Sequence, residues 1–155
     1  MSVKTFGFKN QLNVGDKGES DFKESYKNLS PIKSEERAVD FHLNTGESVE
    51  VKTDTYPMEK TENFFMETVS NSVSGKLGGP FRARQDGVKF FVYYYLNNKQ
   101  FFWFDTIKLC EKLEELIFEK KYKIKSIKNK TWVTLGYAVP RSDLESVLFK
   151  HDVFA

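Results

Sequence analysis

The chain has 155 residues, a formal net charge of +2, 39% hydrophobic residues and 30% charged residues, which describes one compact globular domain. Its single cysteine, Cys110, excludes an intrachain disulfide, and two histidines are too few for a histidine-rich zinc site. The sequence has no apolar run long enough to cross a bilayer and no secretory leader over residues 1–11, so we expect a soluble protein of the cytosol.

The N-terminal part of the chain predicts one amphipathic helix. Residues 1–14 show no clear hydrophobic period, and we expect a mobile arm there. Between residues 16 and 29, apolar side chains recur at three- and four-residue spacing, which is typical of a helix with one buried face. Glu19 lies in the first turns, near the buried edge. Pro31 should end the helix, because proline disfavours helical backbone in the residue before it.

Three pairs of β-rich runs each predict a hairpin. The middle pair is apolar on both faces, which indicates central strands of a sheet. One further apolar segment, residues 63–70, is either a strand or a short helix. The glycines and the proline between residues 72 and 86 require part of that segment to be loop. The paired runs are residues 38–43 with 48–53, 88–96 with 100–104, and 122–127 with 131–139.

Two more helices complete the predicted pattern. Asp105 can cap a helix over residues 106–119, whose apolar side chains form one stripe. Near the C-terminus, Pro140 followed by a Ser-x-x-Glu capping box predicts a helix that runs to about Lys150. The order α-β-β-β-β-β-α-β-β-α therefore predicts an α/β (α+β) domain with a central mixed β-sheet flanked by helices.

The first predicted hairpin carries two acids and a lysine where packing residues are expected. Side chains alternate along a strand, so Glu50 and Lys52 share one face. The hairpin folds Asp40 back beside Glu50, and two carboxylates about 4 Å apart repel by about 4 kcal/mol at a protein-like dielectric. A divalent magnesium or manganese ion would offset this repulsion, and the Val51 carbonyl can supply a further oxygen ligand.

Such a centre suits the hydrolysis of a phosphodiester. The ion would neutralise a phosphate oxygen and lower the pKa of a bound water. Lys52 can position the attacking water or stabilise the charge that develops on phosphorus. Glu19, brought over by the first helix, can complete the metal shell or serve a second ion. The opposing interpretation is a solvated strand face on which Glu50 and Lys52 pair with their neighbours.

These residues resemble the signature of a known family. Asp40 followed by Glu50-Val51-Lys52 resembles the D…(D/E)-x-K motif of the PD-(D/E)XK nuclease superfamily. A preceding helix with Gly18-Glu19 makes the order similar to archaeal Holliday-junction resolvases and phage resolvase-type endonucleases. The resemblance covers residues 15–52, about a quarter of the chain. It departs from the family at Val39, which stands where the motif has proline.

The resemblance implies a restriction-endonuclease-like core and magnesium-dependent hydrolysis of DNA, with manganese able to substitute. Asp40, Glu50 and Lys52 would be the catalytic core, with Glu19 accessory, and Asp40, Glu50, Val51 and Glu19 would hold the metal. The implied protein is a homodimer of phage or mobile-element type that acts in the host cytoplasm. Three alternatives stay open: a site-specific homing or restriction enzyme, a non-catalytic DNA-binding protein on the same fold, and a metal-independent binding module.

Two basic segments are candidates for DNA contact. Lys76, Arg82 and Arg84 lie in the glycine-rich segment, where arginines can make forked contacts with phosphate oxygens. In the third predicted hairpin, Lys123 and Lys125 alternate with apolar residues, so we expect one packed face and one charged face. The opposing interpretations are a flexible solvated loop and a solvated hairpin.

Glu67 is a further candidate with an open role. It lies among the apolar residues of segment 63–70, and carboxylates are seldom buried unpaired. It either reaches the predicted metal site, pairs with an arginine or faces solvent.

Overall fold

A computed structural model describes the chain except residues 1–2, 37–38, 121, 130 and 155. The α-helices and strands are connected by short turns and by three 3-10 helices, η1 to η3, within these residues. In chain order the elements are α1 (Val3–Ser25), η1 (Lys27–Leu29), β1 (Ile32–Lys33), β2 (Phe41–His42), β3 (Ser48–Asp54), η2 (Met58–Lys60), β4 (Asn63–Asn71), β5 (Lys76–Leu77), α2 (Gly79–Gln85), β6 (Phe90–Tyr95), β7 (Gln100–Asp105), α3 (Thr106–Lys120), β8 (Ile124–Lys128), β9 (Val133–Pro140), η3 (Arg141–Val147) and β10 (Leu148–Val153).

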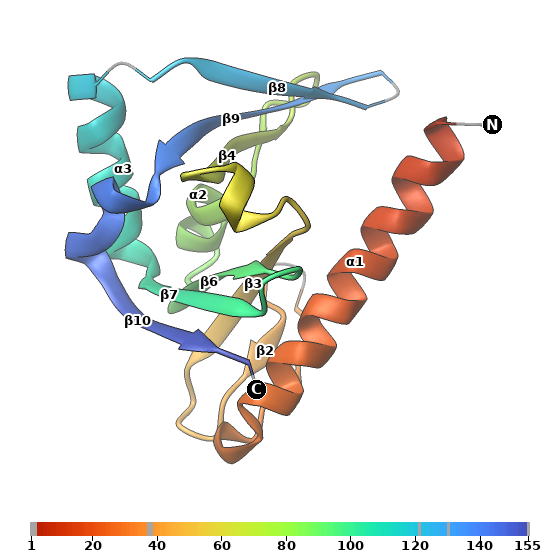
Figure 1. Cartoon of the computed structure of the whole chain (residues 1–155), viewed down its shortest axis with the longest axis vertical. Coiled ribbons are helices and arrows are strands. Elements are labelled where there is room, and N and C mark those ends of the chain that lie inside the picture. Colours follow the sequence, from red (N-terminus) through yellow and green to blue (C-terminus); the bar gives the residue numbers. More distant parts are fainter. Residues whose placement is uncertain (1–2, 37–38, 121, 130, 155) are drawn as a thin grey trace.

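Two β-sheets form the centre of the fold. The larger sheet has six strands in the order β1-β2-β3-β6-β7-β10, and the smaller has four in the order β5-β4-β9-β8. The larger sheet is mixed, because β3 pairs parallel with β6 while its other pairs are antiparallel. Helix α1 covers one face of this sheet, and α2, α3 and the smaller sheet cover the other (Figure 1). The predicted fold class, a central mixed sheet flanked by helices, is confirmed.

Aromatic side chains fill the core on both faces of the larger sheet. On the α1 face, Phe22 stacks on Phe41 with ring centroids 5.2 Å apart. On the other face, Phe64 of β4 packs edge-on against Tyr93 at 4.8 Å. Every residue of β6 is buried, which confirms the prediction of a central strand. Because β3 pairs with β6, this rigid two-sided core fixes the position of the strand that carries Glu50 and Lys52.

The three predicted hairpins are present as β2–β3, β6–β7 and β8–β9. Segment 63–70, for which a strand and a helix were both open, forms strand β4. The helix expected over residues 106–119 is α3. No helix in the described part of the chain is both long and apolar enough to cross a membrane.

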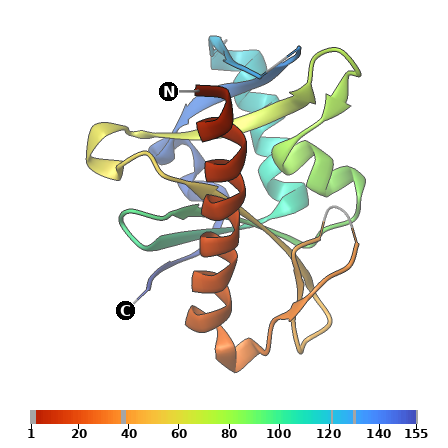
Figure 2. The same cartoon turned by 90° about the vertical axis from the view of Figure 1, so that its right-hand side faces the viewer.

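Helix α1 is longer than the sequence pattern predicts. Where we expected an arm without regular structure, the helix begins at Val3 (Figure 2). Phe22 and Tyr26 anchor its C-terminal end against the sheet. Extension of an anchored helix adds one hydrogen bond for each residue fixed, so it needs no apolar period. The predicted end is close, since η1 follows α1 and Ser30 then takes a left-handed φ of 47°.

The C-terminal helix predicted between Pro140 and about Lys150 is wrong. The chain forms the 3-10 helix η3 and then strand β10, which pairs antiparallel with β7. Strand β7 would otherwise leave its backbone N–H and C=O groups unpaired at a sheet edge. A capping box marks where helical turns start, but it does not set how far they continue.

Part of the glycine-rich segment after β4 is loop, as predicted, and the rest forms β5 and α2. Residues 72–75 form a turn, and β5 then pairs with β4. Pro80 lies in the first turn of α2, where its missing N–H costs nothing. Pro80 and Ala83 are buried, and Cys110 of α3 donates its thiol to the Pro80 carbonyl at 3.3 Å. Helix α2 therefore packs between β4 and α3.

Candidate functional site

Asp40 and Glu50 lie close together at the end of the β2–β3 hairpin. The paired residues of the two strands are Phe41 with Val49 and His42 with Ser48. Asp40 directly precedes β2, and its N–H donates to the Val49 carbonyl at 2.9 Å. After burial, the charge of Asp40 has the largest effect on the pKa of Glu50, so the two carboxylates are near neighbours. Val49 packs in the core that α1 covers, and side chains alternate along β3, so Glu50 points to the face turned away from α1.

Asp40 also closes the end of the hairpin. Its Oδ2 accepts a hydrogen bond from the Val51 N–H at 2.7 Å. The N–H and C=O of a strand residue point to the same side, so the Val51 carbonyl lies on this edge as well. Burial raises the pKa of the Asp40 carboxyl, while the Val51 hydrogen bond and the charge of Lys33 oppose that rise.

Glu50 is partly buried, and one oxygen of its carboxylate is fully buried. Its Oε2 has no hydrogen-bond partner among the described residues. Burial, and then the charge of Asp40, raises the pKa of Glu50 to about 8. An unsatisfied buried polar atom costs about 1–3 kcal/mol, and more for a charged group. A cation between the two carboxylates would offset that cost.

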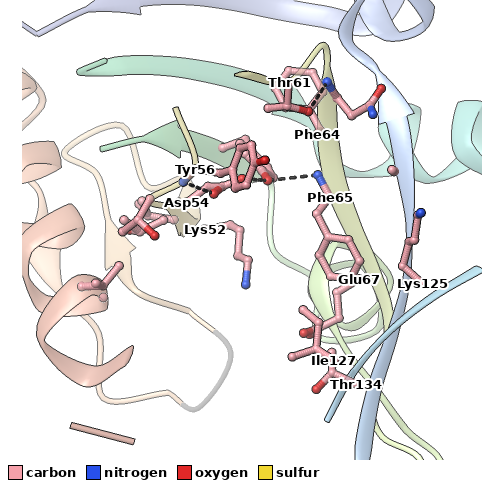
Figure 3. A pocket seen from close by; sticks show the side chains of 18 of the residues that line it. Lys52, Asp54, Tyr56, Thr61, Phe64, Phe65, Glu67, Lys125, Ile127 and Thr134 are labelled. Carbon is pink, nitrogen blue, oxygen red and sulfur yellow. Dashed lines mark hydrogen bonds between the residues drawn. The ribbon is translucent and has the colours of Figure 1, made fainter. Parts of the chain in front are cut away.

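Lys52 points from the same face of β3 into a cleft (Figure 3). The cleft has a volume of ≈ 830 Å³ and lies between α1, the end of β3 and strands β4, β8 and β9. It forms because β2 contains only Phe41 and His42, so the second half of β3 has no strand neighbour on that side. Asp40 and Glu50 are not among the residues that line the cleft, but the Lys52 ammonium is near enough for its charge to lower the pKa of Glu50.

Lys33 connects Glu19 to Asp40. The preceding residue, Gly18, packs directly on Thr53 of β3, and a Cβ at Gly18 would overlap the Thr53 hydroxyl. Glu19 forms an ion pair with Lys33 of β1. The charge of Lys33 also acts on Asp40. The glycine therefore lets α1 approach closely enough for Glu19 and Asp40 to share one cationic neighbour.

Two residues outside the sequence-derived metal set are neighbours of Glu50. The charge of Arg82 from α2 lowers the pKa of Glu50, and that of Glu67 from β4 raises it, after the larger effects of burial and Asp40. Glu67 also lines the cleft. Gly78 and Gly79 lie so close to Glu67 that a Cβ at either residue would crowd it. Glu67 therefore lies at the cleft and close to Glu50.

The sequence marked Glu67 as a candidate because it is an acid within an apolar segment. Arg82 was predicted as a DNA contact, and no pattern in the sequence places it beside Glu50. Its guanidinium pairs at 3.3 Å with Asp86, the residue that follows α2. Only the packing of α2 on β4 brings this arginine to Glu50.

The remaining predicted DNA contacts are not grouped together. Arg84 forms a two-pronged ion pair with Glu114 of α3, with distances of 2.9 and 3.0 Å. It therefore ties α2 to α3. Lys76 is exposed on β5, and Lys123 is exposed just before β8. Lys125 lines the cleft.

The predicted packed face of the third hairpin is present at Tyr122 and on β9, where Val139 is buried, but not on β8. Strand β8 is exposed at every position, and Ile124 and Ile127 are 55% and 46% exposed. Strand β8 is the outermost strand of the smaller sheet, so it pairs only with β9. The alternation of lysine and isoleucine therefore leaves both kinds of side chain accessible to a ligand.

The oxygen atoms at the hairpin fit a hard cation. No three His, Cys, Asp or Glu side chains gather as a metal-binding group in the part of the chain that the structure describes. Asp40 and Glu50 nevertheless supply two carboxylates, and Val51 a carbonyl. Magnesium commonly takes one or two carboxylates and completes its shell with waters and substrate phosphates. The donor set thus fits magnesium or manganese and lacks the thiolates or histidines that zinc prefers.

Comparison of the sequence with models of protein families and with curated proteins finds no match. The fold and the site define an α/β protein with two carboxylates and a lysine at the open edge of a central sheet. The functional assignment therefore depends on this geometry and on the residue motif.

Proposed function

We propose that the protein is a metal-dependent endodeoxyribonuclease of the PD-(D/E)XK type, which hydrolyses DNA phosphodiester bonds with magnesium and accepts manganese. One observation carries this proposal: the unpartnered, buried Oε2 of Glu50 lies beside Asp40, on the strand face from which Lys52 enters the cleft. A divalent ion bound between the two carboxylates would offset the cost of burying this oxygen.

Each residue has a distinct task in the proposed reaction. Asp40, Glu50 and the Val51 carbonyl would hold the ion, which supplies charge neutralisation at phosphate and a more acidic bound water. Lys52 orients the attacking water or stabilises the negative charge on the phosphoryl oxygens. Glu19 is accessory, because its ion pair with Lys33 positions a cation beside Asp40.

The test is a digestion of supercoiled plasmid, four-way junction and linear duplex with magnesium, manganese or EDTA. We expect cleavage with either metal and none in EDTA. Lys52→Ala should reduce the cleavage rate at saturating DNA by roughly 100-fold or more, whereas the affinity for DNA should fall only severalfold. Lys108→Ala, an exposed change on α3, is the matched control. Cleavage by Lys52→Ala at the wild-type rate would overturn the proposal.

The same digestion separates the candidate substrates. Preference for the junction indicates a resolvase-like, structure-specific enzyme, and cutting at fixed positions of linear duplex indicates a homing or restriction type. Binding without cleavage under every metal condition indicates a non-catalytic DNA-binding protein. We further propose a homodimer working in the cytoplasm, since two centres are needed to cut two strands symmetrically; light scattering of the purified protein measures this.

A further inference from the structure

The cleft beside Lys52 is walled on opposite sides. Helix α1 contributes Val14 and Gly15, and strand β8 contributes Lys125 and Ile127. Figures 1 and 2 both show α1 running alongside the two sheets, with its N-terminal end at the level of the smaller sheet. A volume of ≈ 830 Å³ is that of a pocket for a small molecule. It has room for a few nucleotides of one strand but not for a double helix.

An aromatic ring lies on the wall of this cleft. Phe65 of β4 is half-buried and lines the cleft, whereas its neighbours Phe64 and Met66 are buried in the core. The Phe65 ring rests on Gly136 of β9, where a Cβ would be 2.6 Å from the Phe65 Cζ. Glycine at this position therefore lets the ring lie against the sheet. Figure 3 shows Lys52 and Phe65 pointing into the same space.

The charges around the ring suit a polyanion. Lys52 and Lys125 both line the cleft, from β3 and β8. Two acids also line it. The Asp54 carboxylate is engaged by the Tyr93 hydroxyl and by the Tyr56 N–H, and Glu67 lies towards the proposed metal site, where its charge acts on Glu50. A partly exposed aromatic ring in a cleft that two lysines also line is the combination that binds single-stranded nucleic acid, because bases stack and phosphates pair with the cations.

We infer that this cleft binds an unpaired DNA strand, with a base stacked on Phe65 and its phosphates held by Lys52 and Lys125. The inference rests on the proposed nuclease function and names its substrate class: DNA with unpaired nucleotides at the cut, such as a branch, a flap or a single strand. A base inside a duplex is stacked and paired on both sides, so it offers no free face to Phe65.

The test measures binding in EDTA, where no cleavage interferes. An oligonucleotide that carries the fluorescent base 2-aminopurine is used as a single strand and as a fully paired duplex. We expect the single strand to bind at least about tenfold more tightly and its fluorescence to fall on binding, as stacking requires. Equal affinity for duplex and single strand would overturn the inference.

Variants at Phe65 isolate the stacking contact. Phe65→Leu keeps an apolar side chain without an aromatic face, and we expect it to lose the quenching and about tenfold in affinity. Phe65→Trp should retain both. Phe118→Ala removes an 83% exposed ring on α3 and should change neither. Melting curves establish that each variant is folded. Full quenching by a folded Phe65→Leu would contradict the inference.

The failure of this inference differs from the failure of the nuclease proposal. If the wild type cuts DNA with magnesium and Phe65→Leu binds and cuts equally well, the stacking inference is wrong and the nuclease stands. If the wild type quenches the single strand but cuts no DNA with either metal, the cleft binds DNA and the nuclease proposal is wrong.

Discussion

Asp40 accepts a hydrogen bond from the Val51 N–H at 2.7 Å, at the point where β2 stops pairing with β3. The carboxylate satisfies a backbone donor that a longer neighbouring strand would otherwise satisfy. The rest of that edge of β3 stays open to the cleft. Asp40 therefore has two roles: its side chain ends the hairpin, and its charge contributes to the proposed metal site. A substitution that keeps the hydrogen bond and removes the charge can distinguish them.

Asp40→Asn should separate these two roles. The amide oxygen of asparagine can still accept from Val51, so we expect the melting temperature to change little. The lost charge should lower metal affinity by at least about 100-fold, because even outer-shell changes cost about 10- to 100-fold. Calorimetric titration with manganese measures the affinity. Glu111→Gln, an exposed change on α3, is the control; normal metal binding by Asp40→Asn would exclude Asp40 as a ligand.

The buried Glu50 predicts an unusual dependence of stability on pH. Its pKa is raised by burial, and then by Asp40, from 4.5 to about 8 in the folded protein. Between these pH values the unfolded chain has released the proton that the folded chain retains. The free energy of unfolding of the metal-free protein should therefore fall as pH rises from about 4.5 to 8.

Glu50→Gln should remove this penalty. We expect the variant to be more stable than the wild type at pH 8 in EDTA, by about 2–4 °C in melting temperature for each kcal/mol gained, and to match it near pH 5. Magnesium should raise the melting temperature of the wild type but not of the variant. Thermal melts from pH 5 to 9 measure both effects. A variant less stable than the wild type at pH 8 would contradict the proposed cost of Glu50.

Gly18→Ala should disturb the site from a distance. The added methyl overlaps the Thr53 hydroxyl, so α1 must shift away from β3. We expect a destabilisation of about 1–3 kcal/mol, as for other overpacked contacts, and a lower cleavage rate because Glu19 moves with the helix. Denaturant unfolding and the plasmid assay measure these effects.

Gly15 offers a matched control on the same helix. A Cβ at Gly15 has nothing within 4 Å, so Gly15→Ala should stabilise the protein by about 0.5–1 kcal/mol through helix propensity alone. Thr53→Ala added to Gly18→Ala should recover part of the lost stability. No recovery would mean that the contact with Thr53 is not the cause.

Arg84→Ala tests whether Arg84 ties α2 to α3, as its ion pair with Glu114 indicates, or contacts DNA, as its sequence context predicts. Its partner Glu114 is 54% exposed at the side chain, so the ion pair is screened by solvent and should contribute at most about 1 kcal/mol. We expect DNA affinity to be unchanged, whereas Lys125→Ala should lower it severalfold. Fluorescence anisotropy with labelled DNA in EDTA measures both. A larger loss of affinity for Arg84→Ala than for Lys125→Ala would restore Arg84 as a DNA contact.

The local geometry of the site follows from the sequence itself. The turn between the two strands of the first hairpin and the alternation of side chains are short-range properties, so they predict Asp40 near Glu50 and Lys52 on the same face as Glu50. The aromatic runs of β6 and β7 likewise predict central strands, because residues that are apolar on both faces must be covered on both.

Tertiary structure decided everything that depends on contacts between distant segments. Strand β10 formed in place of a helix because the edge of β7 was available to pair with it. Arg82 and Glu67 lie beside Glu50 because α2 packs on β4. The Phe65 ring lies against the smaller sheet because β9 places Gly136 next to it. Short-range patterns carry no information on which elements meet, because burial of the whole core selects those contacts.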